Sequence, residues 1–265
     1  MKQLNWYQIF GKSNIPDGRT VLPTDDIQIW LNCANIWDKD YITLAEVLAD
    51  TDTLSALIAS SNAVDYMVRS TTWATIICTD STAMSYIGLN NYCANTLLAD
   101  STWKTAIYQS EYKGSVLNIT VPKMTSNTTP SGTCAGTSIS SSGNDYWKAF
   151  NSSEALGWQP SGSDTFGVAK VYYHFTSKNL PCYAHLKWIR SGATYSITVK
   201  VIGSNDGATW TEISPATVLY NDVDTDQILN AIIGYEYVGI VVTYSEIPIT
   251  AGDGFKCQFY GREDV

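Results

Sequence analysis

A ten-residue period of apolar and polar positions runs from about residue 41 to about residue 110. The fourth and eighth positions of each unit are mostly apolar, and the seventh is apolar in every unit: Val47, Leu57, Met67, Ile77, Ile87, Leu97 and Ile107. Spacings of three and four residues place these side chains on one face of a helix. Because ten residues make about 2.8 turns, one continuous helix would carry the apolar stripe around its axis. The pattern therefore predicts a series of short helices, each followed by a turn.

The last position of each unit predicts where these helices begin. It holds a short side chain that can accept a hydrogen bond from first-turn amides: Asp50, Ser60, Ser70, Asp80, Asn90, Asp100 and Ser110. A helix of about eight residues is too short to be stable alone, so the units must stack on one another as a small solenoid suited to scaffolding. Trp73 and Trp103 share one repeat position with Cys93, Ala63 and Ala83, which favours a role as core side chains over contact with a ligand.

The pattern changes after about residue 125. Thr, Ser, Gly, Tyr and Val alternate in short runs bounded by turn signals, which favours antiparallel strands; these runs are 168–175, 184–189, 195–202, 209–213, 237–244 and 255–260. The predicted fold class is therefore α+β and multidomain, with an array of short decapeptide helices followed by an antiparallel β-sandwich of the jelly-roll kind.

Length and composition suggest four segments. The chain has 265 residues, which suits two domains. We expect a cap or docking segment at 1–40, the helical decapeptide region at 41–113, a strand and linker rich in Thr, Ser, Pro and Gly at 114–134, and the sandwich at 135–265.

Charge and cysteine spacing exclude several classes of function. The formal net charge is −9 without a basic run, which argues against a nucleic-acid partner. No stretch approaches the about 18 apolar residues of a membrane span, and no signal-peptide core is evident, so we expect a chain folded in a cytoplasm without membrane insertion. The six cysteines have no paired spacing, which predicts reduced, mostly buried thiols rather than a zinc site or a dithiol motif.

Three motifs between residues 135 and 263 resemble the discoidin-like, galactose-binding-like β-sandwich family, which includes many carbohydrate-binding modules. They are WKAFN at 147–151 followed by GW at 157–158, GSNDG at 203–207 followed by TW at 209–210, and QFYGR at 258–262. The resemblance implies a discoidin-like sandwich with a carbohydrate-binding surface.

The chain departs from the family at two kinds of site. Family members commonly bind calcium through an Asp and a Glu, and this chain has Asn151 and Lys256 at those positions. An ammonium group disfavours a hard cation, so we expect neither a metal nor a cofactor, with Lys256 donating hydrogen bonds to loop carbonyls instead. Galactose-binding members place a His and a second Trp after the Trp that corresponds to Trp158, and here Gln159 and a proline follow.

The carbohydrate-binding residues expected from the resemblance are Tyr146, Trp158, Gln159 and Arg190. Tyr146 could stack on a sugar, and Arg190 matches a family arginine at a strand end, where a guanidinium can donate to vicinal hydroxyls. The other interpretation is that Arg190 is solvated or ion-paired and that Trp158 and Trp210 belong to the structural motifs. His174 and His185 fall in alternating strands and are expected at surface or half-buried positions.

Nothing in the sequence predicts an enzyme. Nucleophilic catalysis needs a nucleophile held by an oriented base, and no such motif accompanies the two histidines. The carboxylates that could form a glycosidase pair lie mostly in turns or in the matched motifs: Asp206, Glu212, Glu236, Glu246 and Asp253.

The whole chain, with its helical decapeptides, a linker that begins MTSNTTP at residue 124 and a terminal sandwich, resembles tail, fibre or other structural proteins of phages and prophages. The resemblance implies a virion protein, assembled in the bacterial host cytoplasm as a symmetric homo-oligomer with other virion proteins. Its sandwich would meet a host-surface glycan. A purely architectural or decoration protein without glycan binding is the alternative, and a carbohydrate-binding module detached from an enzyme is the third.

Overall fold

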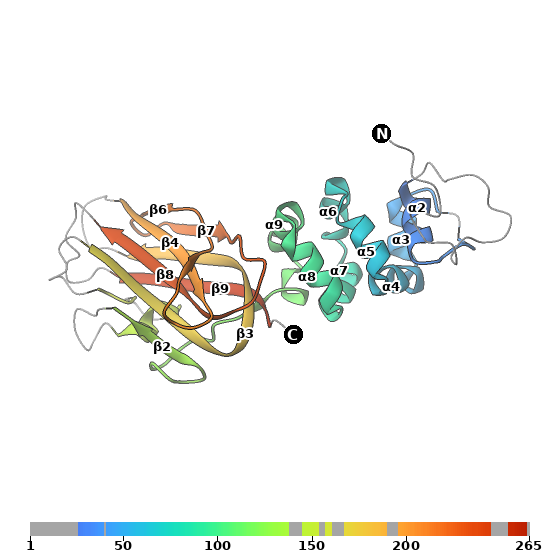
Figure 1. Ribbon diagram of the computed structural model, residues 1–265. Coiled ribbons are helices and arrows are strands. Elements are labelled where there is room, and N and C mark those ends of the chain that lie inside the picture. Colours follow the sequence, from blue (N-terminus) through green and yellow to red (C-terminus); the bar gives the residue numbers. More distant parts are fainter. Residues whose placement is uncertain are drawn as a thin grey trace. The chain divides into compact units, whose positions relative to one another are not determined.

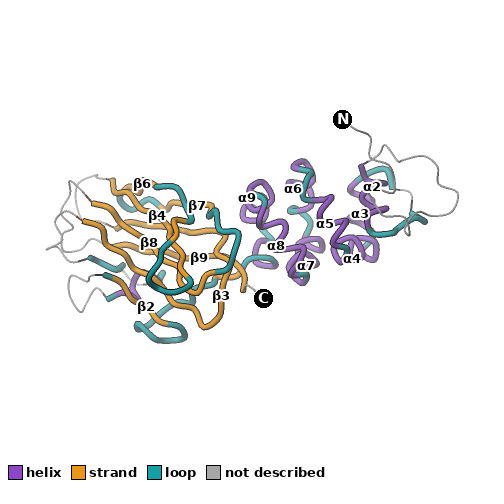
Figure 2. Tube along the Cα trace, viewed as in Figure 1, coloured by secondary structure: helices purple, strands orange, loops and turns teal. Residues whose placement is uncertain are grey.

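The structure is a computed structural model that describes residues 26–39, 41–137, 145–153, 157–160, 167–189, 196–244 and 254–263. The chain divides into two compact units, Met1–Val116 and Leu117–Val265. Helices build the first unit and antiparallel strands the second (Figures 1 and 2). The predicted fold class, short helices followed by an antiparallel β-sandwich, is confirmed.

The helices of the first unit are α2 (Asp26–Cys33), α3 (Leu44–Ala49), α4 (Thr51–Ala59), α5 (Ser61–Met67), α6 (Thr71–Ile77), α7 (Ser81–Leu89), α8 (Asn91–Ala99) and α9 (Ser101–Gln109). From α4 onward, they start every ten residues, at 51, 61, 71, 81, 91 and 101. The predicted N-caps are confirmed, since a side-chain oxygen accepts a first-turn amide at Asp50, Ser60, Ser70, Asp80, Asn90 and Asp100.

Ser110 is the exception among the predicted N-caps. It ends α9, and its hydroxyl accepts from the amide of Tyr112 at 3.0 Å in a turn that leads to the short 3-10 helix η2 (Lys113–Ser115). The residues after Ser110 lack the apolar stripe of the earlier units, so no further α-helix has a face to bury.

The helices make two main kinds of contact. Sequence neighbours pack together at α3–α4, α4–α5, α7–α8 and α8–α9, and several helices also pack against the helix three further along. The second kind of contact joins α2 to α5, α4 to α7, α5 to α8 and α6 to α9. Indole hydrogen bonds also link separate helices. The Trp30 nitrogen in α2 donates to Ala63 O in α5, and the Trp103 nitrogen in α9 donates to Val68 O at the end of α5, both at 3.1 Å. The seventh-position side chains are buried, and so are Trp73 and Trp103, which confirms their predicted core role.

The second unit is a sheet of antiparallel strands. They are β1 (Asn118–Ile119), β2 (Thr133–Gly136), β3 (Gly167–Ile189), β4 (Ser196–Ser204), β5 (Thr211–Glu212), β6 (Thr217–Tyr220), β7 (Asp224–Ile228), β8 (Tyr235–Tyr244) and β9 (Gly254–Glu263). The strand order is β1-β9-β3-β8-β4-β5, with β2 and β7 also paired to β3 and β6 paired to β4. A 3-10 helix, η4 (Tyr146–Phe150), packs on β9.

The long strand β3 serves both layers of the sandwich (Figure 1). Its first half pairs with β2 and β8, its second half pairs with β7 and β9, and its register with β8 shifts between His174 and Asn179. The Phe150 ring lies 6.0 Å from that of Tyr173 on β3 and 6.4 Å from that of Phe259 on β9, so the two layers share one core. The sequence predicted two separate strands where the structure has one.

The segment predicted as a linker is packed into the sandwich instead. β1 pairs with β9, and Met124 is fully buried. The amide of Met124 donates to Phe150 O at 3.3 Å, and the Asn151 side chain donates to Met124 O at 2.7 Å. The apolar residues Val121 and Met124, set within a polar stretch, explain the difference, because their burial draws the segment onto the core.

Parts of two predicted segments, 1–40 and 135–265, lie outside the described residues. Of the expected N-terminal segment at 1–40, the structure describes 26–39, where α2 buries Trp30 and Leu31. Within the described ranges, no helix has the length and apolar character needed to cross a membrane.

Candidate functional site

Three neighbouring strands present polar side chains on one face of the sandwich. In the second half of β3, Ala184, Leu186 and Trp188 are buried, so the alternate residues point outward. Directly paired residues of antiparallel strands share a face, and the register of β7 and β9 with β3 therefore forms two rows. The first row holds Asp226, His185 and Gln258, and the second holds Asp224, Lys187 and Lys256.

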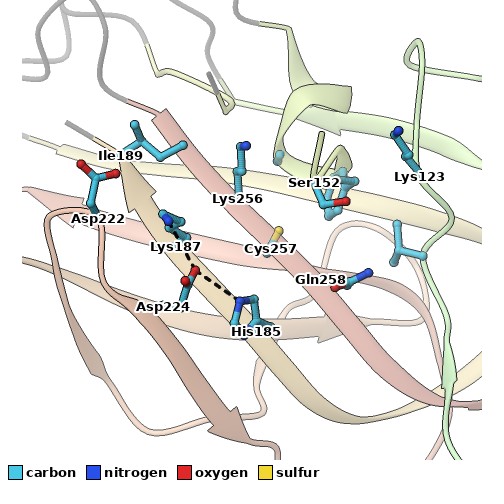
Figure 3. Close-up of a pocket in the computed structure, with 13 residues that line it drawn as sticks. Lys123, Ser152, His185, Lys187, Ile189, Asp222, Asp224, Lys256, Cys257 and Gln258 are labelled. Carbon is cyan, nitrogen blue, oxygen red and sulfur yellow. Dashed lines mark ion pairs between the residues drawn. The ribbon is translucent and has the colours of Figure 1, made fainter. Parts of the chain in front are cut away.

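These rows border a cavity of about 420 Å³ (Figure 3). Other elements complete its wall: Val121 and Lys123 follow β1, Ser152 follows η4, and Asp222 precedes β7. The remaining lining residues are Ala149, Phe150, Ile189 and Cys257. The volume lies within the range of sites that hold small molecules.

Ion pairs order the side chains at one end of the cavity. One oxygen of Asp224 lies 3.3 Å from His185 Nε2 and 3.7 Å from Lys187 Nζ, so both side chains converge on it (Figure 3). The other ring nitrogen of His185 lies 2.7 Å from Asp226 Oδ1. The His185 side chain is 38% exposed, and solvent screening limits each such pair to about 1 kcal/mol or less. The pairs therefore fix the direction of these groups more than they stabilise the fold.

Asp222 reaches the cavity through a special backbone conformation. Its φ is 57°, in the left-handed region that Asp tolerates better than most residues. Its amide donates to Trp188 O at 2.8 Å, which ties the turn before β7 to β3. The turn thus places a carboxylate beside the row of Asp224, Lys187 and Lys256.

The lining groups are suited to binding. Burial raises the pKa of the Cys257 thiol well above its usual range, so this side chain remains protonated and is a poor nucleophile at neutral pH. In the described part of the chain, no cluster of three His, Cys, Asp or Glu side chains is arranged to hold a metal ion. The hydroxyl, amide, carboxylate and ammonium groups that remain are hydrogen-bond partners.

Two carboxylates considered for a glycosidase pair have structural contacts. Asp206 accepts the amides of Ala208 and Thr209 at 2.8 and 2.6 Å, which closes the turn at 206–209. Glu212 pairs with Lys200 at 2.7 Å. Glu246 and Asp253 lie outside the described residues.

Three of the four expected carbohydrate-binding residues lie in the described part of the chain, and none of these three lines the cavity. Trp158 is fully buried and Gln159 is 3% exposed, which corrects their expected contact with a glycan because neither side chain offers accessible surface. Trp158 and Phe255 exchange backbone hydrogen bonds at 3.0 and 2.8 Å, so Trp158 anchors the start of β9 next to Lys256. Arg190 lies outside the described residues.

Tyr146, the fourth expected residue, is half-buried at the start of η4, away from the cavity lining. Burial raises the pKa of its hydroxyl. Its ring lies close to Gly136 of β2, where an added Cβ would come within 2.7 Å of the ring. Its contact with a sugar stays a prediction.

Trp210 packs with aromatic side chains of β3 and β8. Its ring centroid lies 4.9 Å from that of Tyr172 and 6.2 Å from that of Tyr237, and Lys170 Nζ lies 4.5 Å from it. His174 stacks on Tyr237 at 4.0 Å and is half-buried, like His185, as expected. The contacts of Trp210 fit the structural role that the motif suggested.

The sequence interpretation missed most of the cavity. β7 reads DTDQI and has no apolar alternation, so nothing indicated a strand there. Lys256 was singled out only as a replacement for a calcium ligand, and Gln258 only as the first residue of the family motif at 258–262. Lys187 belonged to no motif. A search for charged residues on alternate positions of the strand runs would have found Lys187, although it could not have paired it with Lys256.

No protein-family model matches this chain, and no curated protein matches it. Several solved structures resemble its C-terminal half. A chitosan-binding module from a chitosanase/glucanase of Paenibacillus sp. IK-5 is 22% identical, with 49% of this chain and 95% of that chain covered and a TM-score of 0.39. The family 32 carbohydrate-binding module of C. perfringens NanJ, solved with galactose, is 14% identical, with coverages of 48% and 92% and a TM-score of 0.37. The C-terminal domain of a Bacteroides fragilis chitobiase is 11% identical, with coverages of 49% and 93% and a TM-score of 0.39.

Proposed function

We propose that the sandwich unit binds a glycan in the cavity on the face formed by β7, β3 and β9. The observation that carries the proposal is the convergence of donor and acceptor groups from separate elements on one cavity of about 420 Å³.

The chemistry of the lining matches a polyhydroxylated ligand. Sugar hydroxyls both donate and accept hydrogen bonds, and the cavity offers acceptors at Asp222, donors at Lys256, and both kinds at Ser152 and Gln258. Ile189 adds apolar surface against which the C–H groups of a sugar ring can pack. Such a site binds by positioning many modest hydrogen bonds and needs no covalent step.

In this proposal the protein is a structural component of a phage virion. The helical unit attaches it to other virion proteins, and the sandwich meets a glycan on the host surface. Many copies in a symmetric assembly would raise the effective affinity of a weak site, because linked sites bind at high effective concentration.

A purely architectural role is the second candidate. Exposed apolar side chains favour it, since Ile232 is 73% and Ile233 is 55% exposed in the segment before β8. Adjacent exposed isoleucines of this kind are suited to contact with another protein. In that role the sandwich would pack on neighbouring virion proteins and bind no sugar.

The test is a glycan array probed with the full-length protein, followed by titration of each positive glycan with Gln258→Ala. Loss of the amide should weaken binding about two- to tenfold, because one hydrogen bond contributes about 0.5–1.5 kcal/mol. Tyr260→Phe is the matched control: it removes the 3.0 Å hydrogen bond that the Tyr260 hydroxyl donates to Gln258 and leaves the amide in the cavity.

The outcomes separate the two candidates. Saturable binding that Gln258→Ala weakens and Tyr260→Phe preserves supports glycan binding in this cavity. Absence of binding to any glycan, by folded protein presented in many copies, would favour the architectural role.

A further inference from the structure

A histidine ring lies between two carboxylates at the edge of the cavity. Asp226 Oδ1 lies 2.7 Å from Nδ1 of His185, and Asp224 Oδ1 lies 3.3 Å from Nε2, a contact that Figure 3 shows. Both carboxylates come from β7, where Thr225 separates them, so they point to one face of the strand. The ring of His185 therefore bridges two alternate residues of the neighbouring strand.

The bridge is complete only when the ring is protonated. A neutral imidazole has one N–H donor, and its other nitrogen is an acceptor. A carboxylate oxygen is also an acceptor, so a neutral ring can hold Asp226 or Asp224 and repels the other. The imidazolium donates from both nitrogens and can hold both. The contacts on the two ring nitrogens are therefore those of the protonated form.

The carboxylates of β7 depend on this bridge for their direction. None of the five side chains of β7 is buried, whereas the neighbouring strand β9 buries Phe255, Cys257 and Phe259. Asp224 lines the cavity, and the side chains of β3 that it contacts are His185 and, at 3.7 Å, Lys187. Loss of the ring proton should turn the Asp224 carboxylate away from His185 and so change this part of the cavity wall.

Histidine is the side chain that ordinarily changes its charge between about pH 5 and pH 8. The other titratable groups around this ring are Asp222, Asp224, Asp226, Lys123, Lys187, Lys256, Tyr183, Tyr260 and Cys257. Burial and the charge of Asp226 raise the pKa of Tyr183 to about 12 and raise that of Tyr260 as well. Since carboxylates and ammonium groups ordinarily keep their charge in this range, the proton of His185 is the one expected to change.

We infer that His185 is a positioning residue of the cavity and that its protonated form prepares the site for the ligand. The inference rests on the proposed glycan-binding function and adds its regulation. The glycan binds most tightly while the ring holds both carboxylates, and its affinity falls as the pH rises and the ring loses its proton. Because the pairs are partly exposed, we expect a change of about two- to fivefold between about pH 5.5 and pH 8.

The experiment measures the affinity of the full-length protein for a neutral oligosaccharide at several pH values in this range. The probes are neutral galactose and N-acetylglucosamine oligosaccharides, which do not change their own charge, and the tightest binder is titrated. Nitrogen-15 NMR of the histidine side chains follows the protonation of His185 in the protein without glycan. We expect both ring nitrogens to be protonated at the lower pH, and the amide shifts of β7 to change together with the ring.

Two variants and a control assign the effect. His185→Gln should abolish the pH dependence of binding. Asp226→Asn keeps the shape of a side chain that does not line the cavity, and it should weaken binding about twofold at about pH 5.5 and change it little at about pH 8. His174→Gln is the matched control, because His174 is the other histidine of the chain and stacks on Tyr237 away from the cavity lining. Circular dichroism checks that each variant is folded.

Several results would overturn the inference. Equal affinity across the pH range would refute the role of His185 and leave glycan binding in the cavity intact. Affinity that rises with pH would show that the neutral ring favours the ligand. A pH dependence that His185→Gln retains would belong to another group, and a ring that stays neutral at about pH 5.5 would refute the bridge by itself. Absence of binding to every probe would remove the proposed function together with the inference.

Discussion

The two units of this protein use their polar side chains in different ways. In the helical unit, polar side chains at the ends of the decapeptides cap the next helix, as when Asp80 accepts the amide of Ala83 at 2.8 Å. In the sandwich, polar side chains on β7, β3 and β9 form outward rows that border a cavity. Capping satisfies the chain's own backbone, whereas the rows present charged and polar groups to a cavity. This difference supports the proposal that the sandwich binds a ligand and that the helices act as a scaffold.

The units also differ in the sequence distance of their contacts. The helix caps join residues three apart, and the Trp103 indole reaches a carbonyl 35 residues away. In the sandwich, the Thr120 hydroxyl donates to Phe259 O across 139 residues of sequence. We expect the helical unit to respond to substitutions locally and the sandwich to respond as a whole.

The largest expected effect is that of Trp103→Ala. Trp103 is fully buried and donates to Val68 O, so its truncation should lower the free energy of unfolding of the helical unit by about 3–5 kcal/mol. Hydrogen-exchange mass spectrometry should show faster exchange in α5, α6 and α9 and unchanged exchange in the strands. Trp103→Phe, which keeps most of the volume, should cost less. Equal loss of protection in the strands would contradict the separation of the two units.

Gly239→Ala should have the next largest effect, although the substitution in the sandwich is small. A Cβ at Gly239 of β8 would lie 2.2 Å from Val171 O and 2.7 Å from Tyr172 Cα, and backbone atoms cannot move aside cheaply. We expect a loss of about 1–3 kcal/mol in the free energy of unfolding, measured by chemical denaturation. Gly114→Ala in the helical unit is the matched control, because nothing lies within 4 Å of the added atom. Comparable losses of unfolding free energy in the two variants would show that the close backbone contacts at Gly239 do not cause the destabilisation.

The N-caps offer a smaller and more local effect. Asp80→Ala removes the acceptor of the Ala83 amide and should lower the free energy of unfolding of the helical unit by about 1 kcal/mol. Asp80→Asn keeps an acceptor oxygen and should cost only a fraction of this. If the two variants are equally destabilised, the negative charge of Asp80 matters more than its hydrogen bond.

The smallest expected effect is a pH dependence present in both units. The Tyr41 hydroxyl, the Thr53 amide and the Lys39 ammonium hold the pKa of Asp50 well below its usual range, and the Thr209 and Ala208 amides do the same for Asp206. Because the unfolded pKa is about 3.9, the stability from each carboxylate is present above about pH 4 and is lost as the pH falls through the lower folded value. The Tm difference between the wild-type protein and Asp50→Asn, or Asp206→Asn, should therefore shrink below about pH 4. A difference that stays constant down to pH 2 would contradict this.

Local features were predictable from the sequence because their determinants are close together in the chain. A cap and the amides it accepts are two or three residues apart, so Asp50, Asn90 and Asp100 could be recognised directly. The motifs around residues 147–158 and 203–210 indicated the sandwich for a similar reason. Ser110 shows the limit of this local reading, because a cap needs an apolar helix face after it.

The cavity could not be predicted in this way because the register of strand pairing creates it. Lys187, Asp224 and Lys256 become neighbours only when β7 and β9 align on β3, and the polar sequence of β7 gave no sign of a strand. Trp158 and Gln159 were expected at the glycan-binding surface for a different reason. The family motif marks their position in the chain, but their burial depends on contacts with distant residues such as Phe255.

The most direct test of glycan binding on the β7, β3 and β9 face is amide chemical-shift mapping of the full-length protein titrated with a glycan that binds on the array. The account predicts that the largest shift changes lie in 185–189, 222–226 and 256–258, with the helical unit unaffected. Changes concentrated around Tyr146 and Trp210, or in the segment that holds Ile232 and Ile233, would contradict the placement of the site.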